Sequence, residues 1–364
     1  MRLRGRLVCA LHECGLPLLL VASLVCAAAG VLGPARVAVA VLVVQAARLA
    51  VAHCDLSLRM LGTSASRRAY AGRTVWVVGA SQGLGGQVAL DLASCGARVV
   101  LSSRRADALQ EVATKCSALG AAGTHVVTLD LNELDSVVAA SQVVSAVASE
   151  HGGLAYCFLL AGGTQRAAAE DTQPAVDARL MQLNALGLMA LAKAALPAMR
   201  LSPSSRVVVV SSAAGKLASP GQAGYAATKH ALNGFFASLR SELAGSGVGV
   251  TVVCPGPVAT GAPGQPRVTF GATLGTSALG GGKSDAAGHH AAGTQEKARL
   301  SLREATAWTL AAGAHGVREA WVARHPILLL LFISQYCPLL AGTIIDARGP
   351  KRVLAAREGG DMYK

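Results

Sequence analysis

The sequence predicts an α/β fold in which helices cover both faces of a doubly wound parallel sheet of about seven strands. Short valine-rich runs, typical of strands buried on both faces, alternate with longer segments whose apolar residues have helical spacing. Parallel strands of one sheet are joined by right-handed crossover connections. The alternation of strands and helices therefore places helices on both faces of the sheet. The expected strands are 75–78, 99–101, 126–129, 157–160, 207–210, 250–253 and 320–323.

The first expected strand is followed by a glycine-rich turn and then by a segment with helical spacing, 88–93. Glycines in such a turn let the backbone approach a pyrophosphate, and the amino terminus of the next helix offers free N–H groups and a positive dipole end. Alone, the pattern fits any tight turn, but the order of strand, turn and helix is that of a Rossmann dinucleotide site. The turn reads Gly79-Ala80-Ser81-Gln82-Gly83-Leu84-Gly85.

The end of the second expected strand predicts which nicotinamide cofactor binds. Where an acidic residue would hold a free ribose 2′-hydroxyl, the chain has Ser102, Ser103, Arg104 and Arg105. Hydroxyls and guanidiniums suit a 2′-phosphate, so NADP(H) is favoured over NAD(H). The alternative is that the two arginines only solvate the start of the next helix.

Tyr225 and Lys229 lie in an apolar, helix-like run, and a separation of four residues places both on one helix face. A free phenol has a pKa of about 10, so a nearby cation must stabilise the phenolate if Tyr225 is to exchange a proton near neutral pH. Ser212 follows the run 207–210 and is expected at the carboxyl end of a parallel strand, where ligands of open α/β sheets bind. The spacing by itself is also that of an ordinary helix face, so its interpretation depends on this context.

These residues resemble the motifs of the short-chain dehydrogenase/reductase family over roughly residues 72–261. The resemblance implies that Tyr225 donates a proton and that Ser212 orients the substrate carbonyl. Lys229 would lower the pKa of the tyrosine and bind the nicotinamide ribose, and Asn184 would hold a water that links Lys229 to solvent. The matching positions are Gly79, Gly83, Gly85, Asn184, Ser212, Tyr225, Lys229 and Pro255-Gly256-Pro257-Val258.

The same resemblance implies a cofactor site. Asp130, after the third strand, matches an adenine-contacting acidic position, although an aspartate is equally ordinary in a turn before a helix. No metal is expected, because His289-His290 has no cysteine or carboxylate at ligand spacing. The expected cofactor residues are Gly79, Ser81, Gln82, Gly83, Leu84, Gly85, Ser103, Arg104, Arg105, Asp130, Leu131, Gly162, Tyr225, Lys229, Pro255, Gly256 and Val258.

A narrower resemblance is to the membrane-associated branch that includes dehydrogenase/reductase family member seven. It implies an NADPH-dependent enzyme that interconverts a carbonyl and an alcohol on a small apolar substrate such as a steroid, a retinoid or a long-chain ketone. A ketosphingoid-base reductase and a catalytically weak, membrane-anchored binding or scaffold protein are the alternatives. The stretches that carry this resemblance are 101–105, 162–166, 229–236 and 254–258, together with the tail from Glu319 through Pro338.

Two positions depart from the family pattern. Val78 stands where the family has a threonine, and 159–162 lacks the paired asparagines that this threonine helps to hold. We expect Val78 to pack against Leu160, which would replace a polar contact by an apolar one. Replacing both polar partners of a contact by apolar groups is near neutral for stability. The cofactor would nevertheless bind more weakly, and this motivates the binding-protein alternative.

The chain of 364 residues is longer than the region that resembles the family, and the additional residues lie at both ends and in one insertion. Apolar runs at 16–32 and 37–47 predict a membrane anchor of one span or a hairpin, with a cleaved signal peptide as the alternative. We therefore assign 1–70 to the anchor and linker, 71–325 to the NADP-binding domain with a variable substrate loop at 261–298, and 326–364 to an apolar extension with a basic tail. The apolar part of that extension is expected over the substrate entrance or in the membrane interface, or else as a buried core helix.

The formal net charge of +13 has basic residues at both ends of the chain, which suits an anionic membrane surface. No basic stripe with interleaved aromatic residues indicates a nucleic-acid partner. The nine cysteines are scattered without a Cys-x-x-Cys pair, so thiols in a reducing setting are expected. Membrane association, in the endoplasmic reticulum, follows from the anchor and the resemblance, and a homodimer through the helices around Asn184 and Tyr225 is compatible with it.

Overall fold

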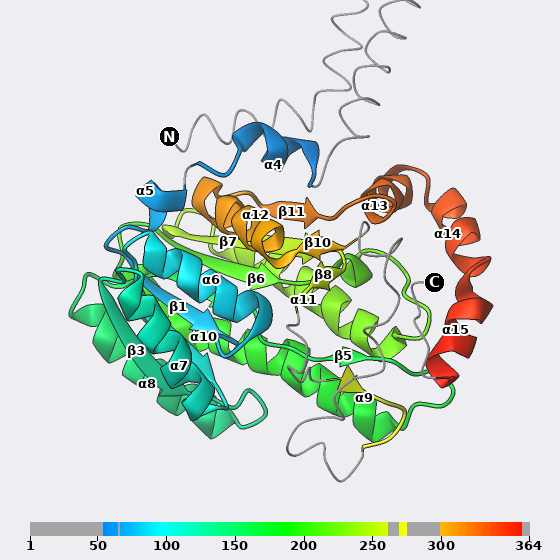
Figure 1. Ribbon diagram of the computed structural model, residues 1–364, viewed down its shortest axis with the longest axis horizontal. Helices are drawn as coiled ribbons and strands as arrows, with labels where there is room; N and C mark the ends of the chain where they lie inside the picture. Colours follow the sequence, from blue (N-terminus) through cyan, green and yellow to red (C-terminus); the bar gives the residue numbers. More distant parts are fainter. Residues whose placement is uncertain (1–53, 65, 261–268, 275–298, 359–364) are drawn as a thin grey trace, which may run out of the picture.

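The computed structural model describes residues 54–64, 66–260, 269–274 and 299–358 (Figure 1). The expected anchor runs at 16–32 and 37–47 and most of the variable loop lie outside these residues. The helices are α4 Leu56–Leu61, α5 Ser66–Tyr70, α6 Gly83–Ser94, α7 Ala106–Ala118, α8 Leu134–Ser149, α9 Pro174–Met181, α10 Gly187–Arg200, α11 Ala223–Glu242, α12 Leu302–His315, α13 Ile327–Tyr336, α14 Pro338–Asp346 and α15 Gly349–Arg357, with a π-helix η1 at Gln182–Leu186 and a 3₁₀ helix η2 at Ala213–Gly215.

Seven parallel strands form the central sheet in the order β11-β7-β6-β4-β1-β2-β3. All seven predicted strands are confirmed, as β1 Thr74–Val78, β2 Arg98–Ser103, β3 Gly123–Thr128, β4 Leu154–Leu159, β6 Ser205–Val210, β7 Val248–Pro255 and β11 Glu319–Val322. Two small pairs were not predicted, β5 Thr164–Gln165 with β9 Thr269–Phe270 and β8 Val258–Ala259 with β10 Leu300–Ser301. The strand order reverses between β1 and β4, and a crevice for ligands is expected at that point.

Alternate side chains of each strand enter apolar clusters on opposite faces of the sheet. Trp76 and Val78 of β1 pack with residues of α8, α10 and α11 on one face. Val75 and Val77 pack with residues of α6, α7 and α12 on the other. The sheet is therefore covered by helices on both faces (Figure 1), as the sequence predicts.

The segment 54–70, expected to belong with the anchor and linker, packs on the core. Leu58 and Tyr70 are fully buried in the cluster beside α12, and Tyr70 Oη donates a hydrogen bond of 2.7 Å to the carbonyl of Leu310. The structured core thus begins upstream of the expected boundary at residue 71.

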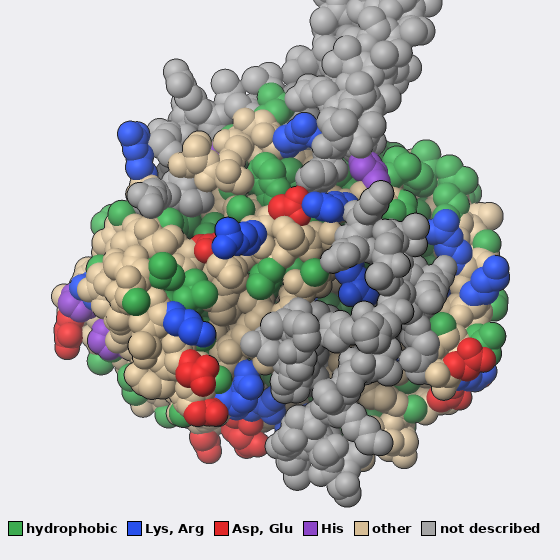
Figure 2. Space-filling model, viewed as in Figure 1, with side chains coloured by type: hydrophobic (Ala, Val, Ile, Leu, Met, Phe, Trp, Pro, Cys, Tyr) green, Lys and Arg blue, Asp and Glu red, His purple; other side chains and the backbone are tan. Residues whose placement is uncertain are grey.

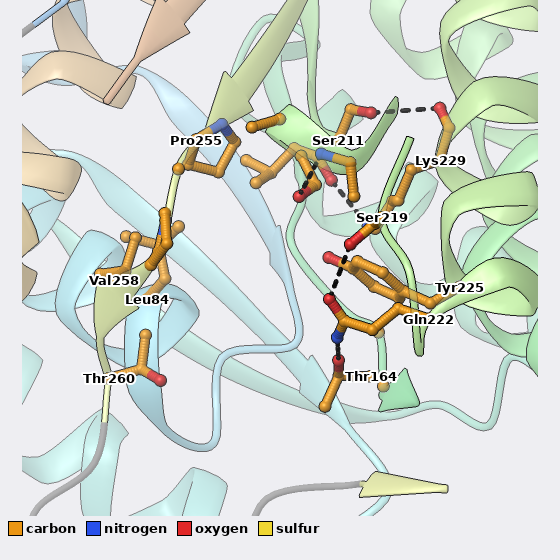
Figure 3. A pocket seen from close by; sticks show the side chains of 18 of the residues that line it. Leu84, Thr164, Ser211, Ser219, Gln222, Tyr225, Lys229, Pro255, Val258 and Thr260 are labelled. Atoms are coloured by element: carbon orange, nitrogen blue, oxygen red, sulfur yellow. Dashed lines mark hydrogen bonds between the residues drawn. The ribbon is translucent and has the colours of Figure 1, made fainter. Parts of the chain in front are cut away.

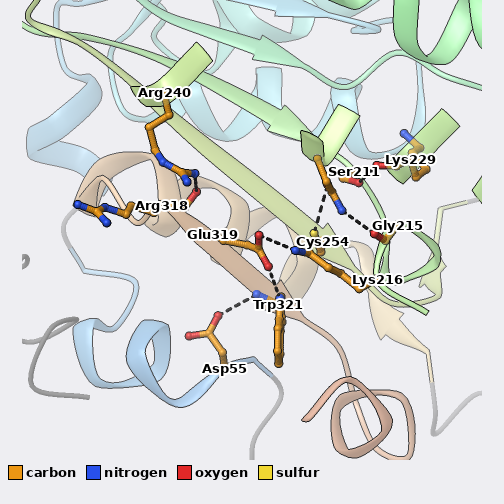
Figure 4. Close-up of polar contacts among 11 residues, drawn as sticks. Asp55, Ser211, Gly215, Lys216, Lys229, Arg240, Cys254, Arg318, Glu319 and Trp321 are labelled. Atoms are coloured by element: carbon orange, nitrogen blue, oxygen red, sulfur yellow. Dashed lines mark hydrogen bonds and ion pairs between the residues drawn. The ribbon is translucent and has the colours of Figure 1, made fainter. Parts of the chain in front are cut away.

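Asp55 joins this segment to the edge strand β11 (Figure 4). Its Oδ1 caps α4 by accepting from Leu58 N at 2.9 Å, and its Oδ2 accepts from Trp321 N at 2.8 Å. Trp321 in turn donates from Nε1 to Glu319 at 2.7 Å, and Glu319 forms an ion pair with Lys216 at 2.8 Å. One polar chain therefore connects the start of the described core, the sheet edge and the turn that follows β6.

The apolar C-terminal segment is only partly a core element: Leu328 and Leu331 of α13 are buried in a small apolar cluster, but other side chains of the segment are exposed. Helices α13 to α15 run along one edge of the molecule (Figure 1), and Tyr336, Leu339 and Leu340 are exposed there at 76%, 88% and 53%. Apolar side chains gather over α13 and α14 in the space-filling view (Figure 2). Other side chains of these two helices line the cavity described below.

Within the part of the chain that the structure describes, one helical stretch, Pro174–Arg200, is long and apolar enough to span a membrane by composition alone. Half of its most apolar window is buried inside the protein, where α10 contributes Leu188 and Leu191 to the core. This burial is typical of a core helix.

Candidate active site

A cavity of ≈590 Å³ lies at the carboxyl ends of the parallel strands, where the strand order reverses. All of the expected cofactor residues line it. Of the four expected catalytic residues, Ser212, Tyr225 and Lys229 line it as well, and Asn184 lies fully buried behind the wall. The topology therefore brings together side chains that are spread over the sequence from β1 to β8.

The glycine turn after β1 packs too closely against neighbouring backbone to accept side chains. Gly79 has φ +90°, and a Cβ there would lie 2.7 Å from Ala161 N. A Cβ on Gly85 would overlap the carbonyl oxygen of Gly79. Helix α6 begins at Gly83, and its N-cap residue Gln82 makes no side-chain cap, so the helix amino terminus offers N–H groups toward the cavity.

The end of β2 adds cationic groups to the same end of the cavity. The Arg105 guanidinium donates to Gln82 Oε1 at 2.8 Å and lies 3.4 Å from Ser81 Oγ, while Arg105 N donates to Ser103 Oγ at 3.2 Å. Arg104 is exposed and also lines the cavity. The strand end and the glycine turn thus form one continuous polar wall.

Asp130 lies in the turn after β3. Its Oδ1 accepts from Asn132 N at 3.0 Å, which makes an ordinary Asx turn, and the residue also lines the cavity. The geometry therefore fits both of the interpretations that the sequence left open.

Tyr225 and Lys229 extend from α11 toward the end of β6 (Figure 3). Lys229 Nζ lies 5.7 Å from the centroid of the Tyr225 ring and donates to the carbonyl of Val210 at 3.1 Å. Ser212 follows β6, and its Oγ accepts from Ala214 N at 3.1 Å at the start of η2. Ser211 Oγ donates to the carbonyl of Lys229 at 3.2 Å, which ties the strand end to the helix.

Lys229 is buried, with 5% of its surface exposed. Burial lowers the pKa of its ammonium from 10.5 to about 8, and the nearby Cys254 acts in the opposite direction. Desolvation disfavours the charged form of any buried base. The lysine can therefore release or accept a proton close to physiological pH.

Asn184 lies in the π-helix η1, a local widening between α9 and α10. Its Oδ1 accepts from Gly163 N at 2.8 Å and its Nδ2 donates to Gly163 O at 2.9 Å and to Thr228 Oγ1 at 3.2 Å. One amide thus binds both sides of a backbone turn and joins it to α11. A Cβ on Gly162 would lie 3.1 Å from Asn184 Oδ1 and 3.8 Å from Lys229 Nζ, so these polar groups meet at this turn.

The expected side-chain contact between Val78 and Leu160 is wrong. Val78 faces the cluster on the α10 side of the sheet, together with its strand partner Leu159, whereas Leu160 packs with the cluster on the other side. Alternation along β4 causes this difference. The direct link between the two residues is a backbone hydrogen bond of 3.0 Å from Leu160 N to Val78 O.

A polar network below Tyr225 was not foreseen from the sequence. Gln222 Nε2 donates to Thr164 Oγ1 and to Gln165 O, each at 3.0 Å, and Gln222 Oε1 accepts from Ser219 at 3.0 Å (Figure 3). Gln165 Oε1 accepts from Tyr225 N at 3.2 Å. The network fixes the first turn of α11, but its members come from separate segments and have no shared spacing that would reveal it.

An apolar part of the remaining wall comes from helices α13 and α14. It was expected only in outline, as a segment over the substrate entrance. Its residues are Ile327, Leu329, Leu330, Ile333, Ile344 and Ile345.

Several known proteins are similar to this chain in sequence. Human dehydrogenase/reductase SDR family member 7 is 34% identical over 293 residues, covering 79% of this chain and 80% of that protein. Bovine dehydrogenase/reductase SDR family member 7B is 40% identical over 200 residues, covering 53% and 60%. Hydroxysteroid 11-beta-dehydrogenase 1-like protein B of Xenopus laevis is 36% identical over 202 residues, covering 54% and 67%.

A solved structure of a polyketide ketoreductase from actinorhodin synthesis, with NADPH, aligns with 52% of this chain and 71% of its own at 27% identity and a TM-score of 0.48. The family of short chain dehydrogenases matches residues 73–267, which include the glycine turn, Ser212, Tyr225 and Lys229. Enzymes of this family are oxidoreductases that bind a nicotinamide cofactor. The chain therefore belongs to the short chain dehydrogenase family.

Proposed function

We propose that the protein is an NADPH-dependent oxidoreductase that interconverts a carbonyl and an alcohol on an apolar, lipid-like substrate. The observation that carries the proposal is the arrangement of Tyr225, the buried Lys229 and Ser212 around one cavity that also contains a glycine-lined helix amino terminus. Family membership gives the class of reaction, and the residues of this chain support the finer assignment.

The chain's own residues fit a phosphorylated dinucleotide. Glycine at 79 and 85 lets the turn pack closely at the start of α6, where uncapped backbone N–H groups can bind a pyrophosphate. Arg104 and Arg105 would bind the 2′-phosphate at the adjoining end of β2. When bound, NADPH would supply the hydride that reduces the carbonyl carbon.

Tyr225 would deliver the proton to the carbonyl oxygen as that oxygen gains negative charge. The Lys229 ammonium, held near the ring by Val210, would stabilise the phenolate that remains. Ser212 would donate a hydrogen bond to the same oxygen and so orient the substrate. Asn184 would keep the Gly162 turn and α11 in register behind these groups.

The wall formed by α13 and α14 supports an apolar substrate body. Its leucine and isoleucine side chains face the same cavity as Tyr225, so an alkyl or polycyclic group can be desolvated there. A steroid, a retinoid or a long-chain ketone has this chemistry.

The proposed domain plan keeps an N-terminal anchor, a dinucleotide-binding domain up to about residue 325, and a C-terminal extension. The apolar runs at 16–32 and 37–47 support the anchor, and the exposed leucines of α14 support contact with lipid. We accordingly propose that the enzyme works at a membrane, in the endoplasmic reticulum. Exposed Leu186, beside Asn184, is available to a homodimer contact on this helix.

A single pair of variants tests the catalytic proposal. The full chain, purified in neutral detergent, is first titrated with NADPH and then assayed for NADPH oxidation against steroid ketones, retinals, quinones and long-chain ketones. Tyr225→Phe should keep NADPH affinity and lower kcat by at least about 100-fold, the usual contribution of a general acid. Tyr336→Phe removes an exposed hydroxyl that does not line the cavity and should leave kcat unchanged.

Tight NADPH binding with no Tyr225-dependent turnover on any of these carbonyls would instead support a binding protein that retains the fold. Equal affinity for NADH and NADPH would refute the role of Arg104 and Arg105.

A further inference from the structure

We propose that the substrate carries an anionic group at the end of its apolar body remote from the reacting carbonyl, and that Arg348 and Arg352 bind this group. The inference rests on the proposed function and narrows its substrate class. It comes from the way charge is distributed along the cavity wall that α14 and α15 form.

On this wall the lining side chains change from apolar to basic along the chain. Ile344 and Ile345 lie at the end of α14, and Arg348 and Arg352 follow at the start of α15. Arg352 N donates to the carbonyl of Arg348 at 3.2 Å, so the two arginines are one turn apart on one helix face, about 6 Å along the axis. A ligand lying along this wall passes from an alkyl surface to two guanidiniums.

A third guanidinium faces the same space from another segment. Arg166 follows β5 and lines the cavity. The loop just beyond it carries Glu170 and Asp171, which pair with Arg357 at the end of α15, the Asp171 contact being 2.8 Å. These exposed ion pairs contribute little energy, but they show that the end of α15 lies beside the loop that follows Arg166.

The carboxylate among the described residues that line the cavity is Asp130, and it lies at the other end, in the turn after β3. Arg104 and Arg105 also belong to that end, beside the glycine turn. Figure 1 shows α15 and α7, which follows Arg105, on opposite sides of the molecule, and basic side chains lie over α14 and α15 in Figure 2. The α15 arginines are therefore separate from the pair proposed for the 2′-phosphate.

Arginine at the rim of an apolar cavity favours one ligand chemistry. Its planar fork binds carboxylate, phosphate or sulfate oxygens in pairs, whereas a neutral alkyl group gains nothing from it. The substrate class that fits both features is an anionic amphiphile, such as an oxo fatty acid, whose carbonyl reaches Tyr225 while its acidic end stays at α15.

The test compares a long-chain oxo fatty acid with its methyl ester, which differ at the charged end. With the full chain in neutral detergent and saturating NADPH, kcat/KM for the acid should exceed that for the ester by about tenfold, as expected for charge-assisted hydrogen bonds. The double variant Arg348→Met, Arg352→Met should remove this preference by raising KM for the acid while kcat and the ester kinetics stay unchanged.

Lys351→Met is the matched control. It removes one positive charge from the same helix turn at an exposed side chain that does not line the cavity. The acid-to-ester ratio should stay at its original value, so a general effect of charge on micelle partitioning would be recognised.

Equal kinetics for acid and ester, or equal losses for both in the double variant, would overturn the proposal. Failure of the proposed function has a different signature, since neither the acid, the ester nor a neutral ketone would then be reduced. In that case calorimetric titration of the full chain with palmitate and with hexadecanol decides the point, and an affinity for palmitate that does not depend on Arg348 and Arg352 would refute the inference.

An anionic lipid surface is the other source of the same chemistry. Kinetics in nanodiscs of phosphatidylcholine, with and without phosphatidylserine, distinguish the two. The preference for the acid should persist in the neutral discs. An effect of the double variant that needs phosphatidylserine and is the same for acid and ester would assign the arginines to the lipid surface and overturn the proposal.

Discussion

The ammonium of Lys229 lies 5.7 Å from the centre of the Tyr225 ring while it donates a hydrogen bond to the carbonyl of Val210. The first relationship brings a positive charge beside a phenol, and the second fixes that charge to the end of β6. Because the lysine is buried, its charge acts with little screening by solvent but is also easily lost.

Carbonyl reduction should slow as the pH rises through about 8, since burial lowers the pKa of Lys229 to about 8. Below this pH the ammonium is present and stabilises the phenolate, and above it the stabilising charge is lost. A kcat profile from pH 6 to 10 checks this. Lys229→Arg keeps its charge over this whole range. It should therefore shift the alkaline fall in kcat to higher pH, whatever the absolute rate of the variant. An unmoved limb would assign the titration to another group.

Lys229→Met should abolish turnover but raise the free energy of unfolding by about 1 kcal/mol at pH 7, because the cost of burying the ammonium exceeds the loss of its bond to Val210. The folded pKa lies below the unfolded value, so the folded state binds fewer protons between about 8 and 10.5 and the wild type gains stability over that range. The difference in free energy of unfolding between Lys229→Met and the wild type should therefore shrink as the pH rises. Urea unfolding at pH 7 and 9.5 measures it, and a constant difference would exclude this origin.

Arg104→Glu should raise the Kd for NADPH by at least about 50-fold and change the Kd for NADH by less than about threefold, because a carboxylate repels the 2′-phosphate and accepts a 2′-hydroxyl. Fluorescence titration of both cofactors gives the ratio. Lys115→Glu reverses a charge on exposed α7 away from the cavity lining and should affect neither constant strongly. Parallel loss of both cofactors in Arg104→Glu would contradict the assignment.

Gly85→Ala should weaken NADPH binding and destabilise the fold by about 1–3 kcal/mol, because its methyl group would overlap the carbonyl of Gly79 in a packed turn. Gly234→Ala is the contrasting change. It lies in α11 with open space around its Cβ, and should stabilise the protein by about 0.5–1 kcal/mol through helix propensity. Thermal unfolding of both variants with and without NADPH checks the prediction, and destabilisation by both would show that the turn is not special.

Asp55→Ala should destabilise the protein by about 2 kcal/mol, since it removes the cap of α4 and leaves Trp321 N without its acceptor. Burial raises the pKa of Asp55 from 3.8 to about 6, with Glu319 adding to the effect. A raised carboxyl pKa contributes stability that is present below 3.8 and lost as the pH passes about 6. The free energy of unfolding of Asp55→Asn, relative to that of the wild type, should therefore be higher at pH 7 than at pH 4. Denaturant titrations of both proteins at pH 7 and pH 4 measure this difference.

The seven strands could be predicted because each is a short, almost wholly apolar run that burial on both faces requires. Ser212, Tyr225 and Lys229 could be placed together because strand ends and helix spacing have fixed geometry. The π-helix around Asn184 could not, since one extra residue in a turn leaves the apolar pattern almost unchanged. Nor could the pairing of Gln222 with Gln165, because long-range hydrogen bonds between single polar side chains have no periodicity.

The Val78 interpretation failed for a local reason. It assumed that neighbours across two strands share a face, whereas the register pairs Val78 with Leu159 and turns Leu160 to the other side of the sheet. A shift of one residue in strand register reverses every side chain. The sequence alone does not give that register.

The bond between Asp55 and Trp321 joins residues that are 266 positions apart, at the two ends of the described core. During synthesis on the ribosome, α4 leaves the exit tunnel long before β11 has been translated. The Asp55 carboxylate therefore has no Trp321 N–H to accept from until the end of synthesis is near. The bond from Asp55 to β11 can therefore form only late in synthesis, although α4 precedes every strand that the structure describes. A nascent chain halted before residue 321 would keep Leu58 accessible to chaperones.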